Sequence, residues 1–228
     1  MLLLGGAVVR VSVSGASLQY VRPGLRSLLI IAGLLLIAIA VMTLWHEARA
    51  GGQPASHDGG HEPRVGWLLL LPVVGLLVVA PPALGSFSAV QSGSLLVAGG
   101  SGAGSDYAPL PTGDPVTVGV LDYASRAVYD SGRTLAGRTV RVTGFIAPGA
   151  DGQPMLGRIV VSCCAADGRP VKVALSGDVP VGVPADTWVA VTGTYEPRTV
   201  RDAINDAVVP FLAVTAWQQV PEPAQPYE

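Results

Sequence analysis

Residues 138–146 read RTVRVTGFI and residues 187–195 read TWVAVTGTY, so two stretches of the chain carry the same pattern. In each stretch two valines alternate with other residues, and Thr-Gly follows. Alternation with a period of two predicts a strand with one buried face. A glycine inside a strand often marks a bulge or a sharp bend, so Gly144 and Gly193 are the expected bend points.

Three further stretches after Gly137 have strand character between Gly and Pro turn signals. The five predicted strands are residues 138–146, 157–163, 169–175, 187–195 and 211–220. A helix over residues 118–129, capped by Thr117, is expected before them. Five short strands suit one small barrel. We therefore predict that residues 114–228 form an all-β domain, a five-stranded OB-like barrel with one leading helix. An open β-sandwich is the alternative.

The N-terminal region, residues 1–85, is predicted to consist of membrane helices. Residues 27–45 (SLLIIAGLLLIAIAVMTLW) and 65–84 (VGWLLLLPVVGLLVVAPPAL) contain no charged residue. A helix needs about 20 apolar residues to cross a bilayer core. Residues 1–20 are interrupted by Arg10 and form either a short third helix or an interfacial segment. We expect a multi-pass protein of the cell membrane.

Residues 86–113 are rich in Gly, Ser and Ala, which predicts a flexible linker. Residues 86–125 contain neither Lys nor Arg. A cytoplasmic segment beside a membrane is more often basic, so this composition favours an extracytoplasmic C-terminal domain.

The loop between the two predicted membrane helices contains all three histidines of the chain, His46, His57 and His61. Acidic residues stand beside them, and imidazole and carboxylate groups are suitable ligands for zinc. The alternative is a solvated loop with incidental histidines, because three histidines do not complete a four-ligand structural site.

Residues 162–168 read SCCAADG and close the second predicted strand. If the strand continued, Cys163 and Cys164 would point to opposite faces, whereas a kink would bring both to one side. In one interpretation a cysteine packs in the core and Asp167 caps a turn. In the other, Cys163, Cys164 and Asp167 form a metal or redox-sensitive site that is one ligand short of a closed one. No histidine lies near the cysteines in the sequence, so we do not expect an enzyme.

The charge content of the chain bears on one class of partner, nucleic acids. Charged residues make up 13% of the chain, against roughly 25% in an ordinary soluble domain. Residues 106–228 carry nine basic and thirteen acidic residues, a net charge of −4. Nucleic-acid binding needs a basic surface, so we expect no nucleic-acid partner.

Several motifs together resemble the YcgQ-like family of permease subunits, over nearly the whole chain. They are GWLLLLPVVGLLVVAPPALGSF (66–87), GRTVRVTGFI (137–146), CCAAD (163–167), DTWVAVTGTY (186–195) and PEPAQPYE (221–228). The resemblance implies an accessory membrane protein that accompanies a multi-spanning permease. In that family the loop between the membrane helices is richer in histidine, which suggests zinc, and the match falls on His46, His57 and His61. The family's turn pattern, His or Cys followed by Cys, two small residues and Asp, falls on Cys163, Cys164 and Asp167. Similar domains in exported lipoproteins also favour an extracytoplasmic barrel.

Three functions follow as hypotheses. The first is a membrane-anchored accessory subunit of a permease that presents or senses a divalent metal such as zinc. The second is a metal- or redox-responsive membrane protein that acts alone. The third is a structural membrane anchor without a ligand.

Overall fold

The structure is a computed structural model that describes residues 2–13, 21, 23–49, 84–96, 107–149 and 151–228. The chain divides into two compact units, residues 1–83 and 84–228. The predicted helix over residues 65–84, apart from its last residue, lies outside the described part of the chain, as do His57 and His61.

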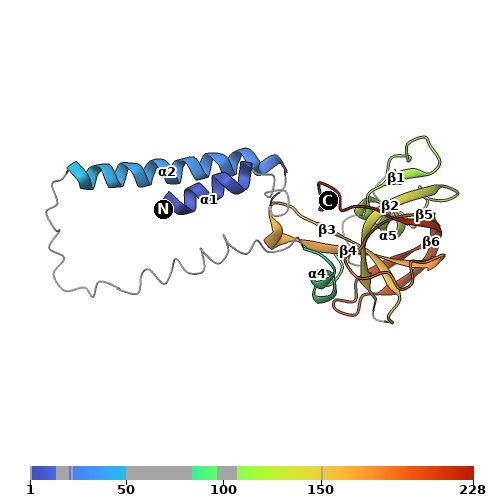
Figure 1. The fold of residues 1–228 in the computed structure, drawn as a ribbon. Coiled ribbons are helices and arrows are strands. Elements are labelled where there is room, and N and C mark those ends of the chain that lie inside the picture. Colours follow the sequence, from blue (N-terminus) through green and yellow to red (C-terminus); the bar gives the residue numbers. More distant parts are fainter. Residues whose placement is uncertain (1, 14–20, 22, 50–83, 97–106, 150) are drawn as a thin grey trace. The chain divides into compact units, whose positions relative to one another are not determined.

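The N-terminal unit contains two packed α-helices, α1 (Leu2–Val13) and α2 (Arg26–Arg49), with the short 3-10 helix η2 (Pro23–Leu25) before α2 (Figure 1). The two helices meet at small residues: a Cβ at Gly5 would lie 2.9 Å from the Gly33 carbonyl oxygen. Arg26 donates from Nε to the carbonyl oxygen of Ser12 at 2.7 Å, at the end of α1. A side chain larger than hydrogen at Gly5 or Gly33 would therefore force the helices apart.

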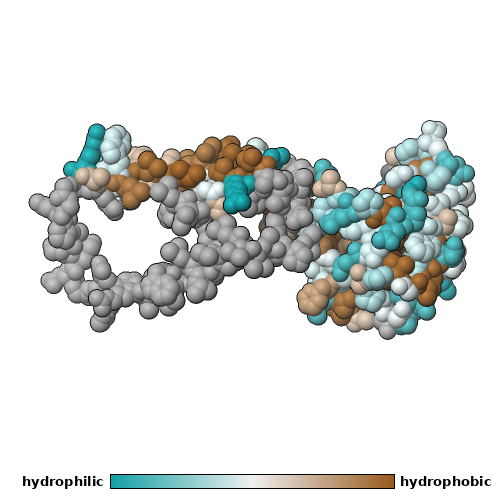
Figure 2. Space-filling view, viewed as in Figure 1, coloured by the Kyte–Doolittle hydropathy of each residue, from teal (hydrophilic) through white to brown (hydrophobic). Residues whose placement is uncertain are grey.

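Helix α2 is long and apolar enough to cross a membrane over the 21 residues Arg26–His46. A signal sequence near an N-terminus can have the same length and composition. Large apolar side chains of α2, among them Leu28, Leu34 and Met42, are more than half exposed. Figure 2 shows the resulting brown surface on the helices of this unit. Among the described residues α2 is the only such helix.

The C-terminal unit consists of one mixed sheet with two helices. Its elements are α4 (Ser86–Gln91), β1 (Val116–Val118), α5 (Val120–Tyr129), β2 (Thr139–Pro148), β3 (Pro154–Val160), the 3-10 helix η4 (Ala165–Asp167), β4 (Arg169–Gly177), β5 (Trp188–Arg201) and β6 (Val208–Gln219) (Figure 1). The strand order is β1-β2-β3-β4-β6-β5, with an additional pairing between β2 and β5. The pairs β1–β2 and β4–β6 are parallel, and the others are antiparallel.

The two repeated stretches of the sequence pair directly with each other. In the antiparallel pair of β2 and β5, Val140 lies opposite Gly193, Val142 opposite Val191, and Gly144 opposite Val189. All four of the repeated valines are fully buried. The alternation therefore predicted the core face of both strands correctly, because every second residue points to the same side of a sheet.

Both glycines of the repeat sit where the chains approach closely. The register of β5 and β6 shifts between Thr192 and Gly193, and a Cβ at Gly193 would lie 2.2 Å from the Ala213 carbonyl oxygen. A Cβ at Gly144 would lie 2.5 Å from the carbonyl oxygen of Gly157. The predicted irregularity is thus confirmed at Gly193, and Gly144 is a place where only glycine fits.

All five predicted strands are present, but the sheet differs from the prediction in having a sixth strand and two parallel pairs. The sixth, β1, occupies the start of the helix expected over residues 118–129, and Thr117 lies inside it. Val116 and Val118 are buried beside β2, so tertiary pairing overrides the helical spacing there, and α5 begins only at Val120. The single sheet also differs from a two-sheet sandwich. The five-stranded OB-like barrel itself stays a prediction.

The first part of the predicted linker, residues 86–96, belongs to the C-terminal unit together with residues 84 and 85. The Asp186 carboxylate accepts from the Ser86 backbone N–H at 2.5 Å and from the Ser86 hydroxyl at 2.6 Å, at the start of α4. Farther along, Leu95 N–H donates to the Pro170 carbonyl at 2.8 Å, and the Leu96 carbonyl accepts from Val208 N–H at 3.1 Å. These hydrogen bonds tie the segment to β4 and β6, and composition alone does not reveal such partners.

Candidate metal centre

The turn between β3 and β4 brings both cysteines and Asp167 together. β3 ends at Val160, and η4 begins directly after Cys164. The Asp167 carboxylate accepts from the backbone N–H groups of Ser162 at 2.9 Å and of Cys163 at 2.7 Å, with a longer contact of 3.4 Å from Cys164. Asp167 therefore holds the turn closed, as one interpretation of the sequence predicted, but neither cysteine packs in the core as that interpretation also expected.

The same turn places the two thiols side by side. The Sγ atoms of Cys163 and Cys164 are 3.7 Å apart, and both cysteines are free. Because the strand stops before them, the kinked alternative of the sequence analysis is the one observed. The ligand atoms of Cys163, Cys164 and Asp167 lie within 4.8 Å of one another, with Cys163 exposed and the other two half-buried.

The electrostatics of the turn oppose ionisation of one thiol. A hydrogen bond to Asp167, then one to Cys164, raises the pKa of Cys163 to about 11. The hydrogen bond from Cys163, with those from the backbone, lowers the pKa of Asp167 below its ordinary value. Without a cation the turn thus holds an ionised carboxylate beside a protonated thiol.

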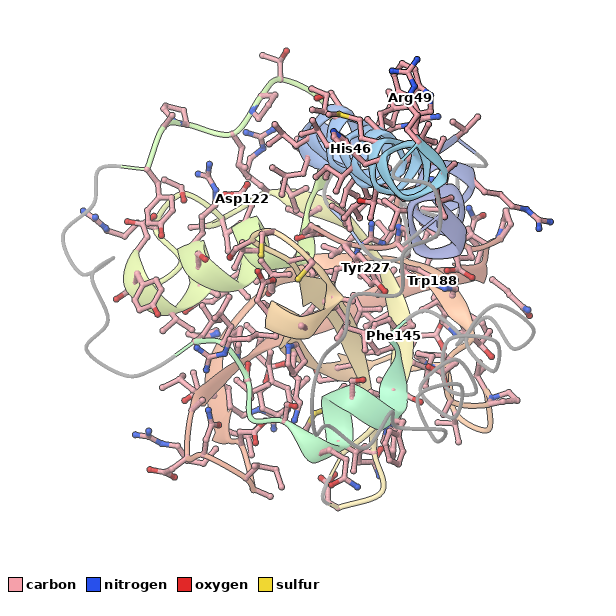
Figure 3. The ribbon with its side chains drawn as sticks, turned by 90° about the vertical axis from the view of Figure 1, so that its left-hand side faces the viewer. His46, Arg49, Asp122, Phe145, Trp188 and Tyr227 are labelled. Atoms are coloured by element: carbon pink, nitrogen blue, oxygen red, sulfur yellow. The ribbon has the colours of Figure 1, made fainter. Side chains whose placement is uncertain are left out.

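A second, smaller hydrophobic cluster lies next to the turn, around the end of β3. Phe145 and Trp188 pack edge to face with ring centroids 5.7 Å apart, and Ile159 and Val161 are buried beside them. Tyr227 packs against this cluster, and Figure 3 shows Phe145, Trp188 and Tyr227 in the C-terminal unit. Rigid neighbours of this kind fix a surface turn in one geometry.

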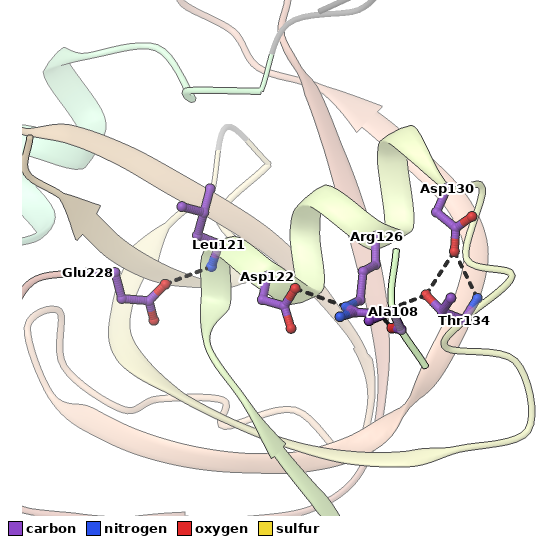
Figure 4. A network of polar contacts seen from close by, with 7 residues as sticks. All are labelled: Ala108, Leu121, Asp122, Arg126, Asp130, Thr134 and Glu228. Atoms are coloured by element: carbon purple, nitrogen blue, oxygen red, sulfur yellow. Dashed lines mark hydrogen bonds and ion pairs between the residues drawn. The ribbon is translucent and has the colours of Figure 1, made fainter. Parts of the chain in front are cut away.

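The end of the chain attaches to the same region. Glu228 exchanges backbone hydrogen bonds with β3 and the residue after it: its N–H donates to the Ile159 carbonyl at 3.0 Å, and its carbonyl accepts from Val161 N–H at 2.9 Å. Its side chain accepts from the N–H groups of Val120 and Leu121 at 2.9 and 2.8 Å, at the start of α5. Figure 4 shows the Leu121 contact beside the network that Arg126 forms with Asp122, Ala108 and Thr134. A carboxylate at a helix N-terminus is electrostatically favourable, so Glu228 links α5 to the base of the turn.

Of the three predicted histidine ligands, the structure describes only His46. His46 is exposed in the last turn of α2, in the N-terminal unit (Figure 3). His57 and His61 lie outside the described residues, so the three-histidine site stays a prediction. Within the described ranges, Cys163, Cys164 and Asp167 are the one group of three such residues close enough to share a metal ion.

One buried ion pair, between Lys172 on β4 and Asp202, is not indicated by any motif of the sequence. Nζ of Lys172 lies 2.7 Å from Oδ2 of Asp202, and both side chains are at least nine-tenths buried. Burial alone would raise the pKa of Asp202, but the hydrogen bond and charge of Lys172 lower it. The available signal was that Lys172 is the only lysine of the chain and interrupts a run of valines in a strand.

Residues 121–228 match the family model described as the DUF1980 C-terminal domain. The match begins inside α5 and includes β2 to β6, the turn with the two cysteines, and Glu228. This part of the chain is therefore similar to the DUF1980 C-terminal domain. No curated protein and no solved structure matches the chain.

Proposed function

We propose that the C-terminal unit binds a thiophilic divalent metal ion, with zinc the best fit, through Cys163, Cys164 and Asp167. The observation that carries the proposal is the 3.7 Å separation of the two Sγ atoms. Two thiolates on a tetrahedral zinc ion, each with a bond of about 2.3 Å, are separated by about 3.8 Å. The sulfur atoms already stand at the separation that the ion requires.

The Asp167 carboxylate can supply the third metal–ligand bond, besides those of the two cysteines. An ionised carboxylate offers roughly four lone-pair positions. The backbone N–H groups of Ser162, Cys163 and Cys164 occupy three of them, the last with a long contact. A metal ion would take the position that the Cys163 thiol uses, so binding releases a proton and leaves the backbone turn in place.

Three protein ligands leave the fourth position of a tetrahedral ion open. The exposed Cys163 and its raised pKa make protons strong competitors for the site. Both properties suit reversible loading and release better than permanent structural binding, which supports a protein that presents or senses the metal.

We propose further that the protein is membrane-anchored, with its C-terminal unit outside the cytoplasm, and that it assists a multi-spanning permease. The apolar helix α2 and the motifs shared with permease subunits support this role. Two packed helices cannot enclose a transport path by themselves, so a partner is required. Purification in mild detergent should recover a multi-spanning protein together with this chain, and repeated recovery of the chain alone would contradict the proposal.

The OB-like barrel is the fold that we propose for β2 to β6. β2 pairs with β3 and β5, β3 pairs with β4, β4 with β6, and β6 with β5. A ring of pairings of this kind supports a curved, rigid scaffold that presents the cysteine turn at the β3–β4 connection.

Zinc titration of the full chain in detergent, with a chromophoric chelator as competitor, tests the metal site. We expect one zinc ion per chain, loss of binding in Cys163→Ser and Cys164→Ser, and weaker binding in Asp167→Asn. Asp151→Asn is the matched control, because Asp151 also accepts a backbone N–H in an exposed turn. His46→Ala tests the histidine loop separately.

The affinity should also rise with pH. Cys163 is protonated below a pKa of about 11, and zinc must displace that proton. For each proton released, the apparent affinity increases up to about tenfold per pH unit. Zinc content that is near zero in all variants and at every pH would leave the structural-anchor function as the better explanation.

A further inference from the structure

A pocket of about 710 Å³ opens on the C-terminal unit, away from the cysteine turn. On β4 its lining includes Lys172, Ala174 and Ser176, which alternate with the core residues Val171 and Val173. The pocket thus lies mainly on the face of the sheet opposite to the core, although the core residue Leu175 also lines it. It starts at the Met155 end of β3, and the cysteines follow the other end of a seven-residue strand, roughly 20 Å away.

The floor of the pocket is apolar and is set by strand register. Met155 on β3 lies opposite Ala174 on β4, and Ala174 lies beside Phe211 on β6. Pro148 and Pro154 contribute from the β2–β3 connection, and Ile204 from the β5–β6 connection. Small-molecule sites typically have volumes of roughly 300–1,000 Å³ and such a mainly apolar lining.

Basic side chains stand around this floor. The guanidinium of Arg198 lies over the Phe211 ring, 3.8 Å from its centroid, and the Arg198 side chain is 54% exposed. The Arg201 side chain, three residues farther along β5, is 58% exposed, donates from one terminal nitrogen to the Asp206 backbone carbonyl at 3.0 Å, and lies 3.7 Å from the Asp206 carboxylate. Lys172 completes the set but is engaged with Asp202 at 2.7 Å.

The acidic groups near the pocket are largely neutralised. Asp202 is paired with Lys172, and Glu196 with Arg198 at 2.9 Å and with the Ser176 hydroxyl. The charged residues of the lining are Lys172, Arg198, Arg201, Asp151 and Asp202, so three cations and two carboxylates leave a net charge of +1. Glu196 and Asp206 lie beside the lining and pair with Arg198 and Arg201, so they offset this charge. Recognition of an anion therefore depends on the exposed guanidinium groups of these two arginines and not on a net positive charge.

We propose that this pocket binds a small organic anion with a flat apolar body and one carboxylate. The apolar body lies on Met155 and Ala174 and stacks against the face of the Arg198 guanidinium that is turned away from Phe211, because planar guanidinium groups stack on π systems. Arg201 binds the carboxylate through two parallel N–H donors. The site is independent of the proposed metal centre, and its ligand needs no metal.

Equilibrium dialysis tests the pocket with the full chain in lipid nanodiscs and empty nanodiscs as the blank. The probe is naphthoate, and naphthylmethanol is its uncharged counterpart. We expect saturable binding of naphthoate and at least about tenfold weaker binding of naphthylmethanol. Arg198→Gln and Arg201→Gln should each weaken naphthoate binding about tenfold or more. Arg133→Gln is the control, since Arg133 is 71% exposed and does not line the pocket.

Circular dichroism of each variant separates loss of binding from loss of folding. Arg201→Gln is the decisive variant, because the Arg201 side chain is more than half exposed and its ion pair with the Asp206 carboxylate is long, at 3.7 Å. The proposal fails if naphthoate shows no saturable binding above empty nanodiscs, if folded Arg201→Gln binds like the wild type, or if naphthylmethanol binds equally well.

Discussion

Asp167 performs two tasks in the turn after β3. Its carboxylate accepts hydrogen bonds from the backbone N–H groups that fold the turn, and it also accepts a hydrogen bond from the Cys163 thiol. The first task makes the residue structural, and the second controls the chemistry of the thiol. A variant that keeps the size of the side chain but removes its charge separates the two.

In Asp167→Asn we expect the pKa of Cys163 to fall from about 11 toward its ordinary value, because the hydrogen bond to Asp167 is the largest cause of the increase. More thiolate is then present at pH 8, so alkylation of Cys163 by iodoacetamide should be about tenfold faster or more. Peptide mass spectrometry distinguishes Cys163 from Cys164, and rates over a range of pH give the pKa. An unchanged alkylation profile in Asp167→Asn, with Asp151→Asn as the control, would show that Asp167 does not hold the thiol proton.

At the scale of the elements, β5 determines how the sheet bends. The first half of β5 pairs with β2 through the repeated valines. Nearly the whole of β5 also pairs with β6, and the register of that pair shifts at two places. The shift at Gly193 allows β5 to follow both neighbours, because a bulge bends a strand and increases its twist. The second shift, between Glu196 and Thr199, places Arg198 over Phe211 in the pocket.

Gly193→Ala should destabilise the C-terminal unit by about 1–3 kcal/mol, because the new Cβ would meet the Ala213 backbone, which cannot move as a side chain can. Urea unfolding followed by the strand signal in circular dichroism measures the change. Thr143→Ala, at a half-buried position on β2, is the control for a small change in the same sheet. Equal stability of Gly193→Ala and the wild type would mean that the close approach at Gly193 is relaxed in solution.

At the scale of the whole molecule, the two units differ in the solvent for which their surfaces are suited. α2 exposes large apolar side chains along its length, whereas the C-terminal unit buries most of its large apolar residues in two clusters and exposes a few, among them Phe87 and Val181. Figure 2 shows this contrast, with a more mixed surface on the sheet domain. An apolar helix surface of this kind is stable in lipid and costly in water.

The chain should therefore remain in the membrane fraction after alkaline carbonate extraction. Leu35→Arg combined with Ile39→Arg should increase the fraction that is released, because an arginine near the centre of a membrane helix costs about 2.5–3.5 kcal/mol. Val181→Arg is the matched control, since Val181 is exposed on the C-terminal unit. Complete extraction of the unaltered chain would contradict a membrane anchor.

Much of the C-terminal sheet was predictable because its signal is local. The valines of the repeat identify two strands and their buried faces, and the Gly and Pro turns separate the other three. The first strand was missed because β1 has only three residues, too few for a periodic pattern. The residues before β1 have the composition of a linker, and their hydrogen-bond partners, such as Pro170 and Val208, are far away in the sequence.

The sequence by itself determined the apolar helix, the alternating strands, the bend at Gly193 and the three residues of the cysteine turn, since each depends on side chains close together along the chain. Tertiary structure alone decided that the two repeated stretches pair with each other, that both thiols turn to one side, and that Arg198 and Arg201 stand over a floor made by Met155, Ala174 and Phe211. These arrangements join residues distant in the sequence. Strand register and loop packing place them, and no periodicity along the chain encodes that placement.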